Sequence, residues 1–341
     1  MGKKIDLTNQ LIDDFIDYQQ TVRALLALVA LVVHDGHTRR PNTHFGFGRR
    51  MTTSNSNMFA PKTDVTPDLV VQKQSDYGII AEVKRSLERD QNRWTTILEQ
   101  LRKYDDNLKG WWTKNEKIQH RNTILLLHQS RSRTFVKYTE TVLKKDKSLF
   151  GPLSSIIEFG ENQERQVFYH FRLEYGKIDD KELNSKLEEG IQVPIEKVVE
   201  TLSNIQYYDG DPPLLLVLVN LWSDYFPSLI ESDCYDPESR TWNIKASISE
   251  TVNEIQKAHG SGALQADPRS CQFPRKDAIK SAFQFLVDNK LAQPTTGEKN
   301  SAYTIKYRKI KADIKEYFAA LISKKSKGTT DISGQMYIPG L

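Results

Sequence analysis

Charged side chains stand at the ends of two apolar runs that read as buried strands. The stretch is TPDLVVQKQSDYGIIAEVKRSL, residues 66–87, in which Asp68 begins the first run and Glu82 and Lys84 end the second. Side chains alternate between the two faces of a strand, so Glu82 and Lys84 point to the same face. Burying an isolated charge is costly, so two carboxylates and an ammonium at this place require partners.

Two explanations account for these three charges. In the first, they form a salt bridge in which Lys84 neutralises Glu82 or Asp68 at the strand ends. In the second, the two carboxylates hold Mg²⁺, which takes oxygen ligands and is usually bound by one or two carboxylates together with water and substrate phosphate. The metal would acidify a bound water and neutralise charge on a phosphate, while Lys84 orients that water or stabilises the transition state. The residues alone leave both explanations open.

The order of these residues resembles a known signature. Pro67-Asp68, a short spacer and then Glu82-Val83-Lys84 within strands is similar to the motif of the PD-(D/E)XK nuclease superfamily. The resemblance covers roughly residues 7–130. It implies a restriction-endonuclease-like core, in which Asp68 and Glu82 bind Mg²⁺ or Mn²⁺ and Lys84 is the catalytic lysine.

The following helix adds a second match. Gln100 and Tyr104 form a Q-x-x-x-Y spacing, which is similar to the motif that follows the active site in RecB-like members of the superfamily. Residues four apart share one face of a helix. The resemblance implies that Gln100 and Tyr104 are site residues; otherwise Gln100 is a solvated helix position and Tyr104 belongs to the core.

The chain also departs from this family. Many members carry on the first helix a glutamate that helps to hold the metal, whereas this chain has no glutamate before Glu82. Asp13, Asp14 or Asp17 could substitute, although a solvated helix face accounts better for at least two of them. RecB-like members with four cluster-binding cysteines exist, but this chain has two cysteines, far apart and without a CxxC pattern.

A Gly-, Asn- and Arg-rich stretch over residues 35–63 reads as a loop with one weak strand. Three histidines in or next to this stretch could suggest a metal site: His34, His37 and His44. Their Gly- and Arg-rich surroundings favour an ordinary loop instead. Four nearby arginines could contact phosphates or only solvate the loop; they are Arg39, Arg40, Arg49 and Arg50.

Hydrophobic periodicity predicts the elements that position these residues. Helices are expected at 7–34, 88–108 and 133–146, and strands at 122–129, in SSIIEFG and in QVFYHFRLEY. The apolar run LLALVALVV within the first helix is too short for a bilayer, which needs about 20 apolar residues. This order predicts an α/β core whose mixed central sheet is flanked by helices, with no membrane span.

Charge divides the rest of the chain. Residues 178–250 carry 5 basic and 15 acidic side chains, whereas residues 268–327 carry 14 basic and 5 acidic. Helices are expected near 195–205 and 213–230, and PESRTWNIKAS as a turn and a strand. A helix from residue 275 and the hairpin that follows are typical of a winged helix. Lys276 and Lys280 on that helix, with Lys306 and Arg308 on the hairpin, are the predicted nucleic-acid contacts, although winged helices also bind proteins.

The predicted organisation is a nuclease-like domain at 1–180, a helical and winged-helix-like nucleic-acid-binding domain at 190–327 and a flexible tail at 328–341. The predicted function is a Mg²⁺-dependent deoxyribonuclease, and the resemblance implies a role in restriction, repair or phage defence. The alternatives are a non-catalytic DNA-binding regulator on a degenerate nuclease fold and an RNase with the same site. Homo-oligomerisation and an accessory protein remain open. The paucity of cysteine favours a reducing cytoplasm.

Overall fold

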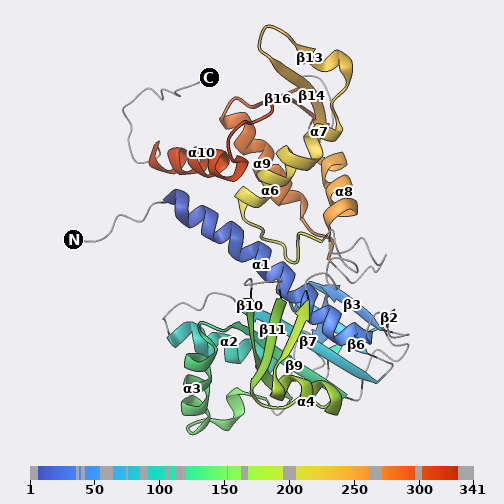
Figure 1. Cartoon of the computed structure of the whole chain (residues 1–341), viewed down its shortest axis with the longest axis vertical. Helices are drawn as coiled ribbons and strands as arrows, with labels where there is room; N and C mark the ends of the chain where they lie inside the picture. Colours follow the sequence, from blue (N-terminus) through green and yellow to red (C-terminus); the bar gives the residue numbers. More distant parts are fainter. Residues whose placement is uncertain are drawn as a thin grey trace, which may run out of the picture. The chain divides into compact units, whose positions relative to one another are not determined.

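The computed structural model (Figure 1) describes most of the chain. The described residues are 7–35, 38–39, 43–53, 64–73, 76–84, 91–104, 108–112, 118, 120–151, 153–162, 168–194, 205–260, 271–295 and 302–328. The predicted helix at 195–205, the TTGEKN turn, His37, Arg40 and the tail after Gly328 lie almost wholly outside them.

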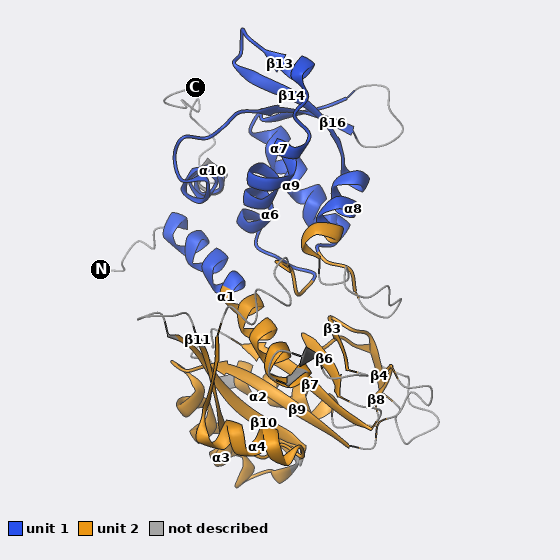
Figure 2. Ribbon diagram, turned by 45° about the vertical axis from the view of Figure 1, so that its right-hand side comes forward, with its two compact units in different colours: residues 1–19, 210–255, 274–341 blue, residues 20–209, 256–273 orange. Residues whose placement is uncertain are grey.

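The chain forms two compact units, neither of which is one continuous segment (Figure 2). Unit 1 contains residues 1–19, 210–255 and 274–341, and unit 2 contains residues 20–209 and 256–273. The first helix, α1 (Leu7–Val33), contributes residues to both. The units therefore differ from the consecutive domains that composition predicts.

Unit 2 is built on a seven-stranded mixed sheet with the strand order β12-β11-β10-β9-β7-β6-β3. The strands in chain order are β3 (His44–Phe47), β6 (Leu69–Lys73), β7 (Tyr77–Lys84), β9 (His120–His128), β10 (Ser154–Asn162), β11 (Phe168–Tyr175) and β12 (Ile191–Pro194). The three central strands β7, β9 and β10 run parallel, and the outer pairs are antiparallel. The carboxyl ends of the three parallel strands consequently meet at one edge of the sheet.

Helices cover both faces of this sheet, which explains why its central strands are apolar throughout rather than alternating. On one face α2 (Gln91–Lys103) and α3 (Ser132–Leu143) join a buried cluster that includes Trp94, Phe135 and Ile80. The carboxyl-terminal half of α1 crosses the strands on the other face (Figure 1), where Gln20 Nε2 donates to Glu161 Oε2 of β10 at 3.1 Å.

By length and composition, α1 could cross a membrane, and it is the one such helix among the described residues. Most of its apolar window is buried within the protein, and Leu25, Leu28 and Val29 have no exposed surface. This burial agrees with the prediction that the run is a core helix.

The acidic stretch after residue 177 continues the sheet, where composition suggests a domain boundary. Asp180 caps α4 (Lys181–Glu189) by accepting from the Leu183 amide at 3.1 Å. The helix packs along β11, and β12 then pairs antiparallel with β11 as the edge strand. The loop-like stretch before β6 likewise contains β3 and β4 (Met51–Thr53). Strand β4 joins β5 (Asp64–Val65) and the later β8 (Leu108–Lys109) in a small three-stranded sheet.

Unit 1 combines helices with a four-stranded sheet of order β13-β14-β16-β15. Its helices are α6 (Leu214–Asn220), continued by a π-helical turn and α7 (Phe226–Ser228), then α8 (Ile248–His259), α9 (Lys276–Asp288) and α10 (Ile314–Gly328). Its strands are β13 (Tyr235–Asp236), β14 (Thr241–Ser247), β15 (Ala292–Pro294) and β16 (Ala302–Tyr307). Trp222 is its central side chain, with ring contacts to Phe226, Tyr307 and Phe318.

Candidate functional site

Asp68 and Glu82 lie opposite each other on the β6–β7 hairpin. Leu69 pairs with Ala81, so Asp68, one residue before β6, falls opposite Glu82. Asp68 Oδ2 accepts a hydrogen bond from the Val83 amide at 2.9 Å, and the two carboxyl groups are in hydrogen-bonding contact. Both belong to the sheet face covered by α2 and α3.

Two side chains of the α2 region hold Glu82 from the same side. Gln100 Nε2 donates to Glu82 Oε1 at 3.0 Å, and the Tyr104 hydroxyl donates to that same oxygen. Gln100 Nε2 also lies 3.1 Å from the Tyr104 hydroxyl. Glu82 is only 2% exposed, so these donors supply the polar contacts that water cannot.

Lys84 completes this group, which we call the carboxylate cluster: Asp68, Glu82, Lys84, Gln100 and Tyr104. Lys84 Nζ lies 3.5 Å from Glu82 Oε2, and its side chain is one-third exposed. One ammonium thus serves two carboxyl groups, of which Glu82 is buried and Asp68 is partly buried. The salt-bridge explanation accounts for Glu82, whereas the attraction of the same ammonium for Asp68 does not offset the burial of Asp68 and the charge of Glu82.

The electrostatics of the cluster follow from this imbalance. Burial, and then the neighbouring Glu82, raise the pKa of Asp68 well above its ordinary value of 3.8. Burial lowers the pKa of Lys84, but Glu82 and Asp68 together raise it above its ordinary value. The two acids therefore compete for one positive charge, and a proton on Asp68 relieves their repulsion. A divalent cation bound by hard carboxylate oxygens would relieve it in the same way.

Two further residues that the sequence motifs do not indicate border this cluster. Burial and then the charges of Asp68, Asp209 and Glu82 raise the pKa of Tyr208, whose hydroxyl hydrogen-bonds Asp209. Asp209 also raises the pKa of Lys84. Both residues belong to unit 2 but follow the cluster by more than a hundred positions. No local spacing signals them, because the only pattern there is a turn-like Asp209-Gly210.

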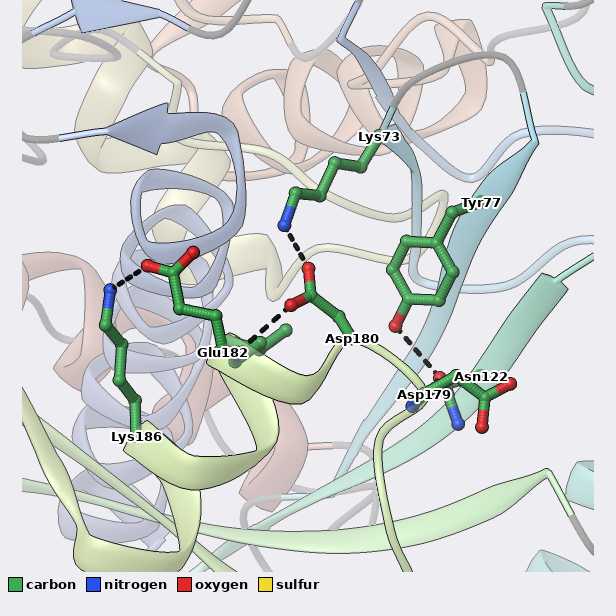
Figure 3. Close-up of polar contacts among 8 residues, drawn as sticks. Lys73, Tyr77, Asn122, Asp179, Asp180, Glu182 and Lys186 are labelled. Atoms are coloured by element: carbon green, nitrogen blue, oxygen red, sulfur yellow. Dashed lines mark hydrogen bonds and ion pairs between the residues drawn. The ribbon is translucent and has the colours of Figure 1, made fainter.

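A second polar network closes the opposite end of the same hairpin (Figure 3). Lys73, at the end of β6, donates to Asp180, and both side chains are largely buried. The Tyr77 hydroxyl donates to Asn122 Oδ1 at 2.9 Å, and the Asp179 amide donates to the same oxygen at 2.9 Å. Here one ammonium meets one carboxylate, as an ordinary structural ion pair requires. This network ties the β11–α4 connection to the sheet.

Two of the loop residues considered as metal or phosphate ligands, His44 and Arg49, take other roles, whereas Arg50 is exposed. The His44 ring stacks on Trp112 with centroids 5.6 Å apart, and the Arg49 guanidinium lies 3.8 Å from the centroid of the Trp112 ring. Arg49 is 2% exposed, and its Nε donates to the Gly110 carbonyl at 2.6 Å. Arg49 is therefore a core residue and not a solvated one.

The three acids of the first helix and the carboxylate cluster belong to different units. Asp13 and Asp14 are exposed, and these two residues and Asp17 belong to the part of α1 in unit 1. The pKa of Asp14 is raised by partial burial and by Asp17 and Asp13. A role for one of these three acids in the cluster stays a prediction.

The four predicted nucleic-acid contacts do not share one surface of unit 1. Lys276 and Lys280 are exposed on α9, whose buried face packs on the sheet through a ring contact between Phe283 and Tyr303. Lys306 lies between the buried Ile305 and Tyr307 in β16, so it points to the opposite face of that sheet.

Arg308, the fourth of these cations, is the residue that follows β16. Its backbone carbonyl accepts a hydrogen bond from Trp222 Nε1 at 3.0 Å. Lys280 borders a groove of about 650 Å³ between α6, α9 and α10, in which Lys325 pairs with Asp288 at 2.5 Å. Helix α10 therefore shares the face of α9 that the winged-helix interpretation assigns to DNA.

Glu231, Asp233 and Cys234 bring three potential ligand atoms within 4.8 Å of one another in unit 1. Two of the three residues are exposed, on a short 3₁₀ turn, and this arrangement is too weak to indicate a metal. No protein-family model matches the chain, and no curated protein matches it.

Proposed function

We propose that the protein is a metal-dependent nuclease that hydrolyses phosphodiester bonds in DNA. Asp68 and Glu82 would hold Mg²⁺ or Mn²⁺, and Lys84 would position the attacking water or stabilise the developing charge. The single observation that carries this proposal is the pairing of two adjacent carboxyl groups, one buried and one partly buried, with only one ammonium. When bound, the metal would supply an acidified water and neutralise phosphate charge.

The other members of the carboxylate cluster fit supporting roles. Gln100 and Tyr104 both donate to Oε1 of Glu82, which fixes the orientation of that carboxylate. Its second oxygen, Oε2, faces Lys84. A carboxylate oriented by such donors is preorganised, because it does not have to turn when charge develops nearby. About one-third of the Lys84 side chain is exposed, so this residue is open to solvent on one side.

We further propose that unit 1 contains a winged-helix-like module that binds DNA. The order α6, β14, α8, α9 and then the β15–β16 hairpin supports this interpretation, as do the exposed cations Lys276 and Lys280. A surface built on α9 alone would make fewer phosphate contacts than one that also used Lys306 and Arg308.

The test is cleavage of DNA by the full chain with Mg²⁺ or Mn²⁺, and its loss in EDTA. Glu82→Gln and Lys84→Ala should each lower the rate by about 10²–10³, as removal of one preorganised group typically does. Glu99→Gln is the matched control, because Glu99 is an exposed carboxylate on the same helix as Gln100. Metal-dependent cleavage that survives both substitutions at the wild-type rate would contradict the proposal.

The same experiment separates the alternatives. Cleavage of RNA but not DNA, sensitive to the same substitutions, would favour an RNase. DNA binding without cleavage under any metal would favour a regulator, in which the carboxylate cluster only stabilises the hairpin.

A further inference from the structure

Helix α3 borders a groove of about 550 Å³ in unit 2 that the proposed function does not yet use. Its charged lining residues are all basic, namely Arg131, Lys137 and Lys145. Two threonines, Thr134 and Thr141, add hydroxyl groups between them. Acidic side chains are absent from the described residues that line this groove.

The residues that line the groove are spaced so that they fall on one side of α3. Positions 131, 134, 137, 141 and 145 repeat at three- and four-residue intervals, with Tyr138 beside Lys137, so they form one stripe along α3 and its two ends. At a rise of about 1.5 Å per residue, the stripe is about 20 Å long. Successive phosphates of one DNA strand rise by about 3.4 Å, so the groove could follow about six of them.

The floor of the groove is aromatic. Trp94 and Tyr138 meet edge to face with ring centroids 5.2 Å apart, and the Tyr138 hydroxyl lies 2.6 Å from Thr95 Oγ1. Since both rings are held by neighbours, they offer a fixed apolar surface against which sugars can pack.

The groove begins at the edge of the sheet that carries the carboxylate cluster. Lys84 pairs in register with Leu127 near the carboxyl end of β9, and α3 starts five residues later. The first residue of the stripe, Arg131, is also the N-cap of α3 and makes no side-chain cap hydrogen bond. The amino end of a helix favours anions because of its exposed amides and its dipole.

We propose that this α3 groove binds the sugar–phosphate backbone of DNA and leads it away from the carboxylate cluster. This inference rests on the proposed nuclease function, and it names the path of the substrate strand. The three cations of the groove would contact phosphates, and Thr134 would donate a hydrogen bond, whereas the Thr141 hydroxyl already donates to the Lys137 carbonyl at 2.8 Å. The Trp94–Tyr138 floor would contact deoxyribose.

The experiment is DNA binding by the full chain at several salt concentrations, in Ca²⁺ so that cleavage is slow. The triple variant Arg131→Ala, Lys137→Ala and Lys145→Ala should bind more weakly than the wild type. If all three cations contact phosphate, the slope of log K against log salt should fall by about 2.7, because each contact contributes about 0.9 for duplex DNA.

The matched control removes three other exposed cations from the same segment: Arg133, Lys144 and Lys147. None of them lines the groove, so the control should keep the wild-type slope. An equal loss in both triple variants would mean that only overall charge matters, and this result would overturn the proposal. Three other results would also overturn the proposal. These are an unchanged salt slope in the groove variant, absence of DNA binding by the wild type, and polyglutamate that competes with DNA as well as DNA itself does.

A small substrate distinguishes failure of the groove proposal from failure of the proposed nuclease site. A small phosphodiester such as bis(4-nitrophenyl) phosphate does not reach along α3, so the groove variant should hydrolyse it at the wild-type rate with Mn²⁺. On long DNA the same variant should show a raised KM with little change in kcat. A variant with lowered kcat on the small substrate would show that the stripe acts on the site instead.

Discussion

Replacing Asp68 by asparagine isolates the electrostatic repulsion within the carboxylate cluster. In Asp68→Asn the new side chain would keep an oxygen for the Val83 amide, and its amide nitrogen could donate to Glu82 where the wild type has a second carboxyl group. Because the pKa of Asp68 is raised in the folded protein, the folded state binds its proton more tightly than the unfolded state does. Stability therefore falls as pH rises from the ordinary value of 3.8 through the raised one.

The expected change in stability follows from the contact with Glu82, in which an amide donor replaces a carboxyl group. A hydrogen bond to a charged group contributes about 1.5–3 kcal/mol, and the unfavourable carboxyl–carboxylate contact is removed as well. In a unit of this size each kcal/mol changes Tm by about 2–4 °C. We expect metal-free Asp68→Asn to melt about 3–12 °C above the wild type at pH 8. The difference should shrink as pH falls toward about 4, because wild-type Asp68 then becomes neutral too.

The assay is thermal unfolding of the full chain in EDTA at pH 8 and at lower pH, and then with Mg²⁺. Asp76→Asn is the control, since Asp76 is an exposed acid in the turn of the same hairpin and should change stability by less than about 0.5 kcal/mol. Saturating metal should stabilise the wild type, by about 2.7 kcal/mol at a hundred times Kd, but not Asp68→Asn. An asparagine variant that is less stable than the wild type at pH 8 without metal would refute this reasoning.

Three further outcomes are expected. Tyr104→Phe removes one of the two donors to Glu82 Oε1 and leaves only Gln100, which should cost about 1.5–3 kcal/mol in unfolding free energy, while the metal concentration needed for half-maximal cleavage rises. Asp180→Ala leaves the buried Lys73 unpaired and should cost about 3–5 kcal/mol by denaturant unfolding, while cleavage per folded molecule stays unchanged. Lys276→Ala with Lys280→Ala should weaken DNA binding and lower its salt slope by about 1.8 in a titration; an unchanged slope would mean that α9 faces protein or water.

The sequence predicts the carboxylate cluster well because its geometry is local. Strand parity puts Glu82 and Lys84 on one face, hairpin pairing puts Asp68 opposite Glu82, and a four-residue helical step lets Gln100 and Tyr104 reach the same oxygen. Each relation depends on the regular repeat of one element or on the pairing of adjacent strands. The sequence does not predict which oxygen of Glu82 accepts each hydrogen bond. Strand parity alone does not show that Oε1 accepts from both donors while Oε2 faces Lys84.

Long-range contacts account for what the sequence does not predict. Arg49 reads as a solvated loop residue because its partner, Trp112, lies about sixty positions later in the chain. Tyr208 and Asp209 follow a stretch without any motif, so only the folded chain brings them to Lys84. The acidic residues after 177 suggest a domain boundary, yet α4 needs only a narrow apolar face, with Leu183 and Leu187 buried, and its other side is free to be charged.

All five side chains of the carboxylate cluster come from a short stretch of chain, between Asp68 and Tyr104. Closing such short loops costs little conformational entropy, and local contacts favour rapid folding. During synthesis this stretch emerges from the ribosome before β10, β11 and β12 exist. We expect the hairpin and α2 to assemble the acids first, with residues 205–209 completing the surroundings of Lys84 only later. A destabilising change in the hairpin would then delay folding, whereas a change at Asp209 would alter the finished site without slowing its formation.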